Sequence, residues 1–275
     1  MALTKVLIAV KTYPTLSKKY DELVCTAGFR EDGSWIRIYP VPFRKLGSDE
    51  QYSKWQWVEI DLVKNTHDHR KESYRPADID KPINTLAKIG TDHGWAERKE
   101  WVLRKVYTNM EELIKEAKDV NIGTSLAVFK PKKVIDFVWE ACEREWDKAT
   151  MRQISDHRRQ YRLFDADEPK QFRPVRKLPY EFSYKFISDD GKERKLMIED
   201  WELGMLFWNC LATADGDEQV ACRKVKEKYF NYMCHRKDFH FFLGTTLRFH
   251  QVGLNPFIII GTFYPPIDTQ LSFPF

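Results

Sequence analysis

Three residues that alternate along one short segment, Trp35, Arg37 and Tyr39, could contact nucleic acid. Successive strand residues point to opposite faces, so these three share one face and the isoleucines between them share the other. Aromatic rings stack on bases and a guanidinium neutralises phosphate, so the pattern predicts a nucleic-acid contact, which Trp57 would join if its face is open. Alternatively, the two aromatic residues cover a second small core, with Arg37 at its rim.

Basic residues gather between Arg152 and Lys177. This stretch holds eight Lys or Arg against four Asp or Glu, an excess equal to the net charge of +4 of the whole chain. An extended basic segment can follow a phosphate backbone. Alternatively, it is a solvated linker whose acidic residues repel phosphate. The contacts predicted in this arm are Arg158, Arg159, Arg162, Arg173, Arg176 and Lys177.

A second chemistry, metal-dependent nucleic-acid cleavage, needs carboxylates that hold Mg²⁺ and orient a water molecule. Asp200 and Glu202 follow a predicted strand, and Asp238 and His240 open another on one face. No acidic-x-lysine pattern joins them, and Asp200 also suits the N-cap of a helix. The sequence therefore predicts no catalytic residues, metal or cofactor, and these four residues with Mg²⁺ remain the alternative.

Cysteine and histidine spacing gives no further site. The five cysteines are scattered, and none forms a C-x-x-C motif or matches a zinc module with the histidines. An odd, sparse set of cysteines is typical of a reducing compartment rather than of a secreted, disulfide-bonded protein. Neither a signal peptide nor a membrane span is recognisable, so we expect a cytoplasmic protein without a membrane partner.

The composition is that of a globular protein. Of 275 residues, 43% are apolar and 31% are charged, which excludes a wholly disordered chain. Aromatic residues make up 14% and include nine Trp, more than a core of ordinary composition requires. Large planar side chains either fill a core or form stacking surfaces.

The first half is predicted to be rich in strands. An Asp-Gly turn at 32–33 joins two of them into a hairpin, and residues 65–94 show no readable pattern. We expect a domain over 1–150, a small twisted sheet or partly closed β-barrel with a helical insertion. The predicted strands are 5–10, 24–30, 35–40, 55–64, 125–129 and 134–139, and the predicted helices are 96–107 and 109–118.

The second half begins after a linker or arm over 151–177. Tyr180, Phe182, Tyr184 and Phe186 share one strand face, which favours a core packed against helices over an open binding surface. We expect an α+β domain over 178–275 with helices on one face of an antiparallel sheet. Its other predicted elements are strands 194–198, 238–243 and 256–264 and helices 200–214 and 217–235.

Three stretches together, Lys11–Pro14, Cys25–Arg44 and Lys237–Pro266, resemble uncharacterised bacterial proteins. This resemblance implies no activity and assigns no catalytic residue.

Taken together, the sequence predicts a nucleic-acid-binding protein that takes single-stranded or modified DNA or RNA, as a component of a processing or defence assembly. One alternative is the metal-dependent nuclease. Another is an interaction subunit of a larger complex, because Trp, Tyr and Arg also dominate protein interfaces.

Overall fold

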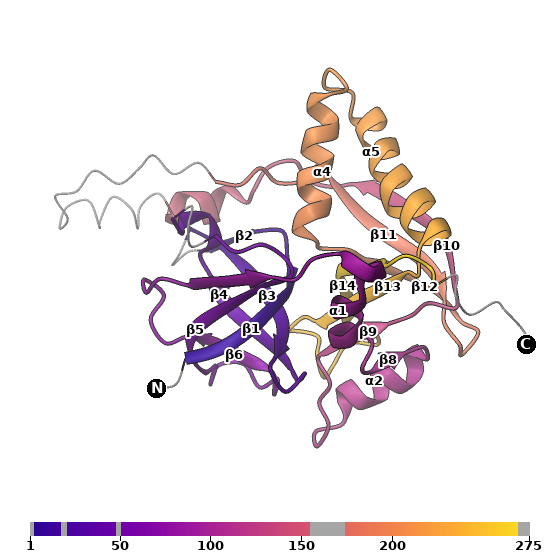
Figure 1. Cartoon of the computed structure of the whole chain (residues 1–275). Helices are drawn as coiled ribbons and strands as arrows, with labels where there is room; N and C mark the ends of the chain where they lie inside the picture. Colours follow the sequence, from indigo (N-terminus) through magenta and orange to yellow (C-terminus); the bar gives the residue numbers. More distant parts are fainter. Residues whose placement is uncertain (1–2, 18–20, 48–50, 155–173, 269–275) are drawn as a thin grey trace, which may run out of the picture.

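A computed structural model describes residues 3–17, 21–47, 51–154 and 174–268. The fold is α+β, as predicted. A closed five-stranded barrel is followed by a unit of two further sheets with helices (Figure 1). Within these described residues, no helix is long and apolar enough to cross a membrane.

The barrel closes because β1 pairs with β3 on one side and with β5 on the other. Alternate residues of its strands, such as Val6, Ile8, Val58 and Ile60, are buried in one core cluster. Closure leaves no unpaired barrel edge. In order around the barrel, the strands are β1 (Leu3–Lys11), β3 (Asp21–Arg30), β4 (Trp35–Val41), β6 (Ser73–Pro76) and β5 (Gln56–Lys64). The short β2 (Thr15–Ser17) pairs with β3, β7 (Asn84–Lys88) pairs with β5, and the 3-10 helix η1 (Phe43–Lys45) follows β4.

Two helices connect the barrel to the second unit. The first, α1 (Asp92–Val102), is followed by the short β8 (Val106–Tyr107) where the sequence predicted continued helix. The second, α2 (Met110–Lys118), begins as predicted at Asn109, whose side chain accepts hydrogen bonds from two backbone N–H groups of the first turn.

The second unit is built on the predicted aromatic strand. Phe182, Tyr184 and Phe186 are fully buried and pack against Phe137 and Phe241, so the predicted core face is confirmed. Figure 1 shows α4 and α5 side by side near β10 and β11. One sheet contains β10 (Lys133–Ala141), β11 (Tyr180–Ile187) and β12 (Glu193–Met197). The other contains β14 (Phe257–Phe263), β13 (His240–Thr245), β9 (Leu126–Phe129) and β8. The helices are α4 (Trp201–Ala212), α5 (Glu218–Lys226), the π-helical η2 (Glu227–Tyr232) and α6 (Met233–Arg236).

Strand pairing divides the chain earlier than the sequence predicted. β9 pairs with β13, and β10 pairs with β11, so residues 106–141 complete sheets whose other strands come from the C-terminal part. The predicted first domain ran to residue 150. Pairing across such sequence separations leaves no local signal, and this is why the sequence placed these strands with the barrel.

Helix α4 docks on the barrel through a close contact at Gly204. Tyr13 lies against this glycine, accepts a hydrogen bond from Trp208 Nε1 at 2.8 Å, and donates one to the Arg176 carbonyl at 2.7 Å. A Cβ atom at position 204 would lie 2.2 Å from Tyr13 Cδ2. The absence of a side chain at Gly204 therefore lets the barrel and the second unit approach.

We expect Gly204→Ala to lower the free energy of unfolding by about 1–3 kcal/mol, because the Tyr13 ring is held by two hydrogen bonds and cannot move freely. Alanine by itself favours a helix over glycine by about 1 kcal/mol, so steric conflict and helix propensity predict opposite signs. Urea denaturation measures the change, with Met205→Ala on the exposed side of the same helix as control. A stabilised Gly204→Ala variant would contradict the close contact.

Candidate functional site

A cleft of about 630 Å³ lies where the barrel meets α1, α4 and β14. Its wall combines cationic and aromatic side chains with a single carboxylate. The residues that matter for its chemistry are Lys11, Lys54, Lys88, Arg98, Trp55, Trp95, Trp201, Tyr264 and Glu202. We refer to this hollow as the cleft.

Arg98 is a buried cation of the cleft. Its guanidinium carbon lies 4.9 Å from the ring centres of both Trp55 and Trp95, and only 7% of the residue is exposed. Nη2 donates to the Ile89 carbonyl at 2.8 Å, whereas Nε is buried with no hydrogen-bond partner among the described residues. A buried donor without a partner is costly, so a ligand atom that accepts from Nε would be stabilised here.

Both tryptophans that flank Arg98 have left-handed backbone conformations. The φ angle is 66° at Trp55 and 68° at Trp95, and His93 and Gly94 directly before Trp95 are left-handed as well. Such a conformation costs a bulky residue about 1–2 kcal/mol, and strain of this kind concentrates at ligand sites. Backbone hydrogen bonds hold Trp55 in place, since its N–H donates to Ile8 at 2.6 Å and its carbonyl accepts from Ile89 at 2.7 Å.

Lys54 forms a buried ion-pair cluster at the base of α4. Its Nζ lies 3.4 Å from both carboxylate oxygens of Asp200 and 3.0 Å from Glu202 Oε2. Burial alone would lower the pKa of Lys54, but the two carboxylates outweigh it and raise that pKa above its usual value. Burial raises the pKa of Asp200, which also caps α4 by accepting from the Glu202 N–H at 3.0 Å.

Lys11 places a second ammonium in largely apolar surroundings. Its Nζ donates to the Tyr52 carbonyl at 3.1 Å and lies 4.2 Å from the ring centre of Phe43 and 5.4 Å from that of Trp201. Burial, together with the nearby Lys54 ammonium, lowers the pKa of Lys11 to about 8. The charge of Lys11 therefore changes just above neutral pH.

The balance of charge favours an anionic ligand. Four cationic side chains line the cleft, against Glu202 on its wall and Asp200 buried behind it. The aromatic side chains add flat apolar surface beside these cations. A ligand with both a flat ring and a negative group matches both features.

The predicted face of Trp35, Arg37 and Tyr39 is not an open surface, which corrects the sequence-based interpretation. Arg37 is only 2% exposed and donates to the Ser125 hydroxyl at 2.8 Å and to the Ser125 carbonyl at 3.0 Å. Trp35 packs edge-on against Phe242 at 5.9 Å, while Tyr39 remains 37% exposed. This outer face of the barrel is covered by β9 and β13, so Arg37 cannot reach a ligand from solvent.

Trp57 does not join such a surface either. It is half-buried, and its ring packs edge-on against Trp101 at 5.2 Å. The Lys5 ammonium lies 5.2 Å from the same ring. Trp57 is therefore a packing residue on the outside of the barrel.

Only the two ends of the predicted basic arm, residues 151–154 and 174–177, belong to the described residues. Arg176 lies 5.3 Å from the ring centre of Trp208, and Lys177 donates to the Glu145 carbonyl at 3.4 Å. Both residues pack along the second unit, and neither lines the cleft. The other predicted contacts of the arm, Arg158, Arg159, Arg162 and Arg173, lie outside the described residues.

The structure separates the four residues of the nuclease alternative. Asp200 and Glu202 meet at Lys54, whereas Asp238 pairs with Lys130 at 2.7 Å. His240 is buried, and its Nδ1 lies 3.2 Å from the Asp238 carbonyl. In the part of the chain that the structure describes, no three His, Cys, Asp or Glu side chains are arranged to hold a metal ion.

Sequence reasoning missed the central residues of the cleft. Lys54, Trp55 and Arg98 are distant in sequence from Asp200, and only the folded chain brings them together. Gly94 signals a turn, but a left-handed Trp has no sequence signature because the residue rarely adopts that conformation. The capping role predicted for Asp200 is confirmed, while its pairing with Lys54 was not foreseen.

Comparisons with known proteins match two domain families to consecutive parts of the chain. Residues 2–104 match the domain of unknown function DUF8758, and the match to the next domain begins at residue 105, close to the end of α1. No curated protein matches the sequence at a significant level. Residues 105–274, more than half of the chain, match the domain of unknown function DUF8757, and the chain therefore belongs to this family.

Proposed function

We propose that the protein binds single-stranded nucleic acid in the cleft. The observation that carries this proposal is the buried guanidinium of Arg98, held between Trp55 and Trp95 with an unpartnered Nε. A phosphate oxygen would accept from this donor, and the ammonium of Lys88 would add charge at the same wall.

Aromatic side chains supply the second half of the recognition. Trp95, Trp201 and Tyr264 line the cleft and are only partly buried, so a base has ring surface on which to stack. Stacking on an aromatic residue contributes about 1–3 kcal/mol per base and tolerates every base. The cleft volume lies in the range of pockets for single ligands, which suits an unpaired base rather than a duplex.

Fluorescence anisotropy tests the proposal with labelled single-stranded and double-stranded DNA and RNA at two salt concentrations, with and without Mg²⁺. We expect salt-sensitive binding of single strands, at least about tenfold weaker binding of duplexes, and intact oligonucleotide on a gel afterwards. The absence of binding, or equal binding of duplexes, would contradict the proposal. Oligonucleotide shortened only with Mg²⁺ would support the nuclease alternative instead.

Binding should weaken as the pH rises above about 8, because Lys11 then loses its proton and its positive charge near the ligand. A bound anion raises the pKa of a nearby ammonium. The affinity is therefore constant below the pKa that Lys11 has in the protein without oligonucleotide, and it falls as the pH rises above that value. We expect a loss of about three- to tenfold between pH 7 and pH 9.2. An oligonucleotide of adenine and cytosine excludes titration of the bases themselves in this range.

Lys11→Met is the matched variant for this pH profile. At pH 7 the affinity of this variant for the oligonucleotide should equal that of the unaltered protein at pH 9.2. The affinity of the variant should not change between pH 7 and pH 9.2. An unchanged pH profile in Lys11→Met would show that another group titrates.

A further inference from the structure

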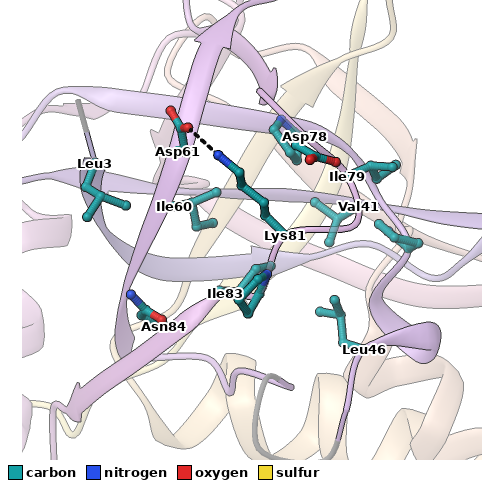
Figure 2. Close-up of a pocket in the computed structure, with 13 residues that line it drawn as sticks. Leu3, Val41, Leu46, Ile60, Asp61, Asp78, Ile79, Lys81, Ile83 and Asn84 are labelled. Carbon is teal, nitrogen blue, oxygen red and sulfur yellow. Dashed lines mark hydrogen bonds and ion pairs between the residues drawn. The ribbon is translucent and has the colours of Figure 1, made fainter. Parts of the chain in front are cut away.

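A second cavity, of about 290 Å³, lies on the barrel and shares no lining residue with the cleft (Figure 2). Its aliphatic wall includes Val41, Ile60 and Ile83, which also belong to the barrel core. Its polar wall holds two carboxylates, Asp61 and Asp78, and one ammonium, Lys81. The cavity thus pairs an apolar interior with a net negative charge at its polar wall.

The carboxylate of Asp61 has unused hydrogen-bonding capacity. Its Oδ1 is buried and accepts no hydrogen bond from any described residue. Its Oδ2 has one contact, with Lys81 Nζ at 3.4 Å, and the Lys81 side chain is 57% exposed. An ionised carboxylate can accept about four hydrogen bonds, so Asp61 can take a stronger donor than it has.

Lys81 indicates which kind of ligand group would donate a hydrogen bond to the Asp61 carboxylate. Figure 2 shows its side chain extending from the segment between β6 and β7 towards Asp61 on β5. An ammonium on an aliphatic chain thus already reaches this carboxylate, at a long distance and from an exposed position. A ligand ammonium that enters the cavity would replace this contact and bury its own aliphatic part against Ile60 and Ile83.

We propose that this cavity binds an organic ammonium carried on an apolar chain, with Asp61 as the partner of the charge. The volume lies at the lower end of the range for ligand pockets, so the apolar part is small. A free alkylamine and the lysine side chain of another protein share this chemistry. The site is independent of the proposed binding of nucleic acid in the cleft.

NMR titration of protein labelled at the isoleucine methyl groups tests the proposal, because Ile60, Ile79 and Ile83 line the cavity. The ligands are hexylamine, which is protonated at neutral pH, and its neutral and anionic counterparts hexanol and hexanoate. We expect saturable shifts at these methyl groups with hexylamine, and binding at least about tenfold weaker for hexanol and hexanoate. Equal affinity for hexanol would overturn the proposal.

Matched variants assign the charge to Asp61. Asp61→Asn keeps the shape of the side chain, and we expect it to weaken hexylamine binding about tenfold or more while the melting temperature shows that the protein stays folded. Lys81→Met removes the competing ammonium and should strengthen binding. An unaffected Asp61→Asn variant, or equal weakening by Asp78→Asn, would contradict the assignment.

One further ligand, Nα-acetyl-lysine methylamide, distinguishes a free alkylamine from the lysine side chain of another protein as the natural ligand. Affinity equal to that of hexylamine would show that the cavity accepts a protein lysine side chain. Clearly weaker binding would assign the site to free alkylamines.

Discussion

Replacement of Arg98 by alanine should weaken binding of a single-stranded oligonucleotide by roughly 10- to 100-fold, the effect expected for losing charged hydrogen bonds to a phosphate. The guanidinium is stacked between Trp55 and Trp95 and has an unpartnered Nε, so its donor is already oriented before a ligand arrives. Arg98→Lys should recover only part of the affinity, because an ammonium cannot reproduce the planar stacking.

Arg104→Ala is the matched control for this experiment. Arg104 also stacks on a tryptophan, with its guanidinium carbon 4.5 Å from the ring centre of Trp101, but it does not line the cleft. We expect its affinity to stay within about twofold of that of the unaltered protein. A folded Arg98→Ala variant with unchanged affinity would exclude Arg98 as the phosphate contact.

Replacement of Lys54 by methionine should lower the free energy of unfolding by about 3–5 kcal/mol, because it leaves the Asp200 carboxylate buried without its counter-ion. Glu202 is half exposed and can be solvated by water, so Asp200 carries most of this cost. The double variant Lys54→Met with Asp200→Leu should recover part of the loss, since it removes both charges but also the N-cap of α4. Urea denaturation of the single and double variants measures both effects.

The loss in Lys54→Met should also depend on pH. Burial raises the pKa of Asp200, and removal of Lys54 takes away the main interaction that opposes this rise, leaving only the hydrogen bond from the Glu202 N–H. The native state then binds a proton more tightly than the unfolded chain does, so stability falls as the pH rises. We expect a smaller loss at pH 5 than at pH 8. A loss of equal size at both values would contradict the account of the buried pair.

Local sequence patterns predicted much of the fold. A run of apolar residues predicted β1, the Asp-Gly turn predicted the hairpin of β3 and β4, and alternation predicted β5. Asp200, the predicted N-cap, accepts a hydrogen bond from the first turn of α4, and Asn109 and Asp217 do the same where helices were predicted to begin. Four aromatic residues on one strand face predicted the core of the second unit. These features depend on neighbours within a few positions, and such neighbours are visible in the sequence.

Other features depend on contacts between distant segments. β6 and β7 are short and polar, and they form because the barrel offers partners on β4 and β5. The face of Arg37 has the composition of a binding surface, but β9 and β13 cover it in the folded chain. The cleft likewise arises where α1 and α4 meet the barrel, a meeting that no single segment encodes.

Ultraviolet cross-linking followed by mass spectrometry identifies which part of the protein contacts a bound single-stranded oligonucleotide. The complex of the unaltered protein with a single-stranded oligonucleotide is irradiated, and the cross-linked peptides are then identified. We expect cross-links to peptides that contain Trp55, Trp95, Trp201 or Tyr264, and we expect these cross-links to be lost in Arg98→Ala. Cross-links confined to other surfaces would show that the cleft does not bind nucleic acid.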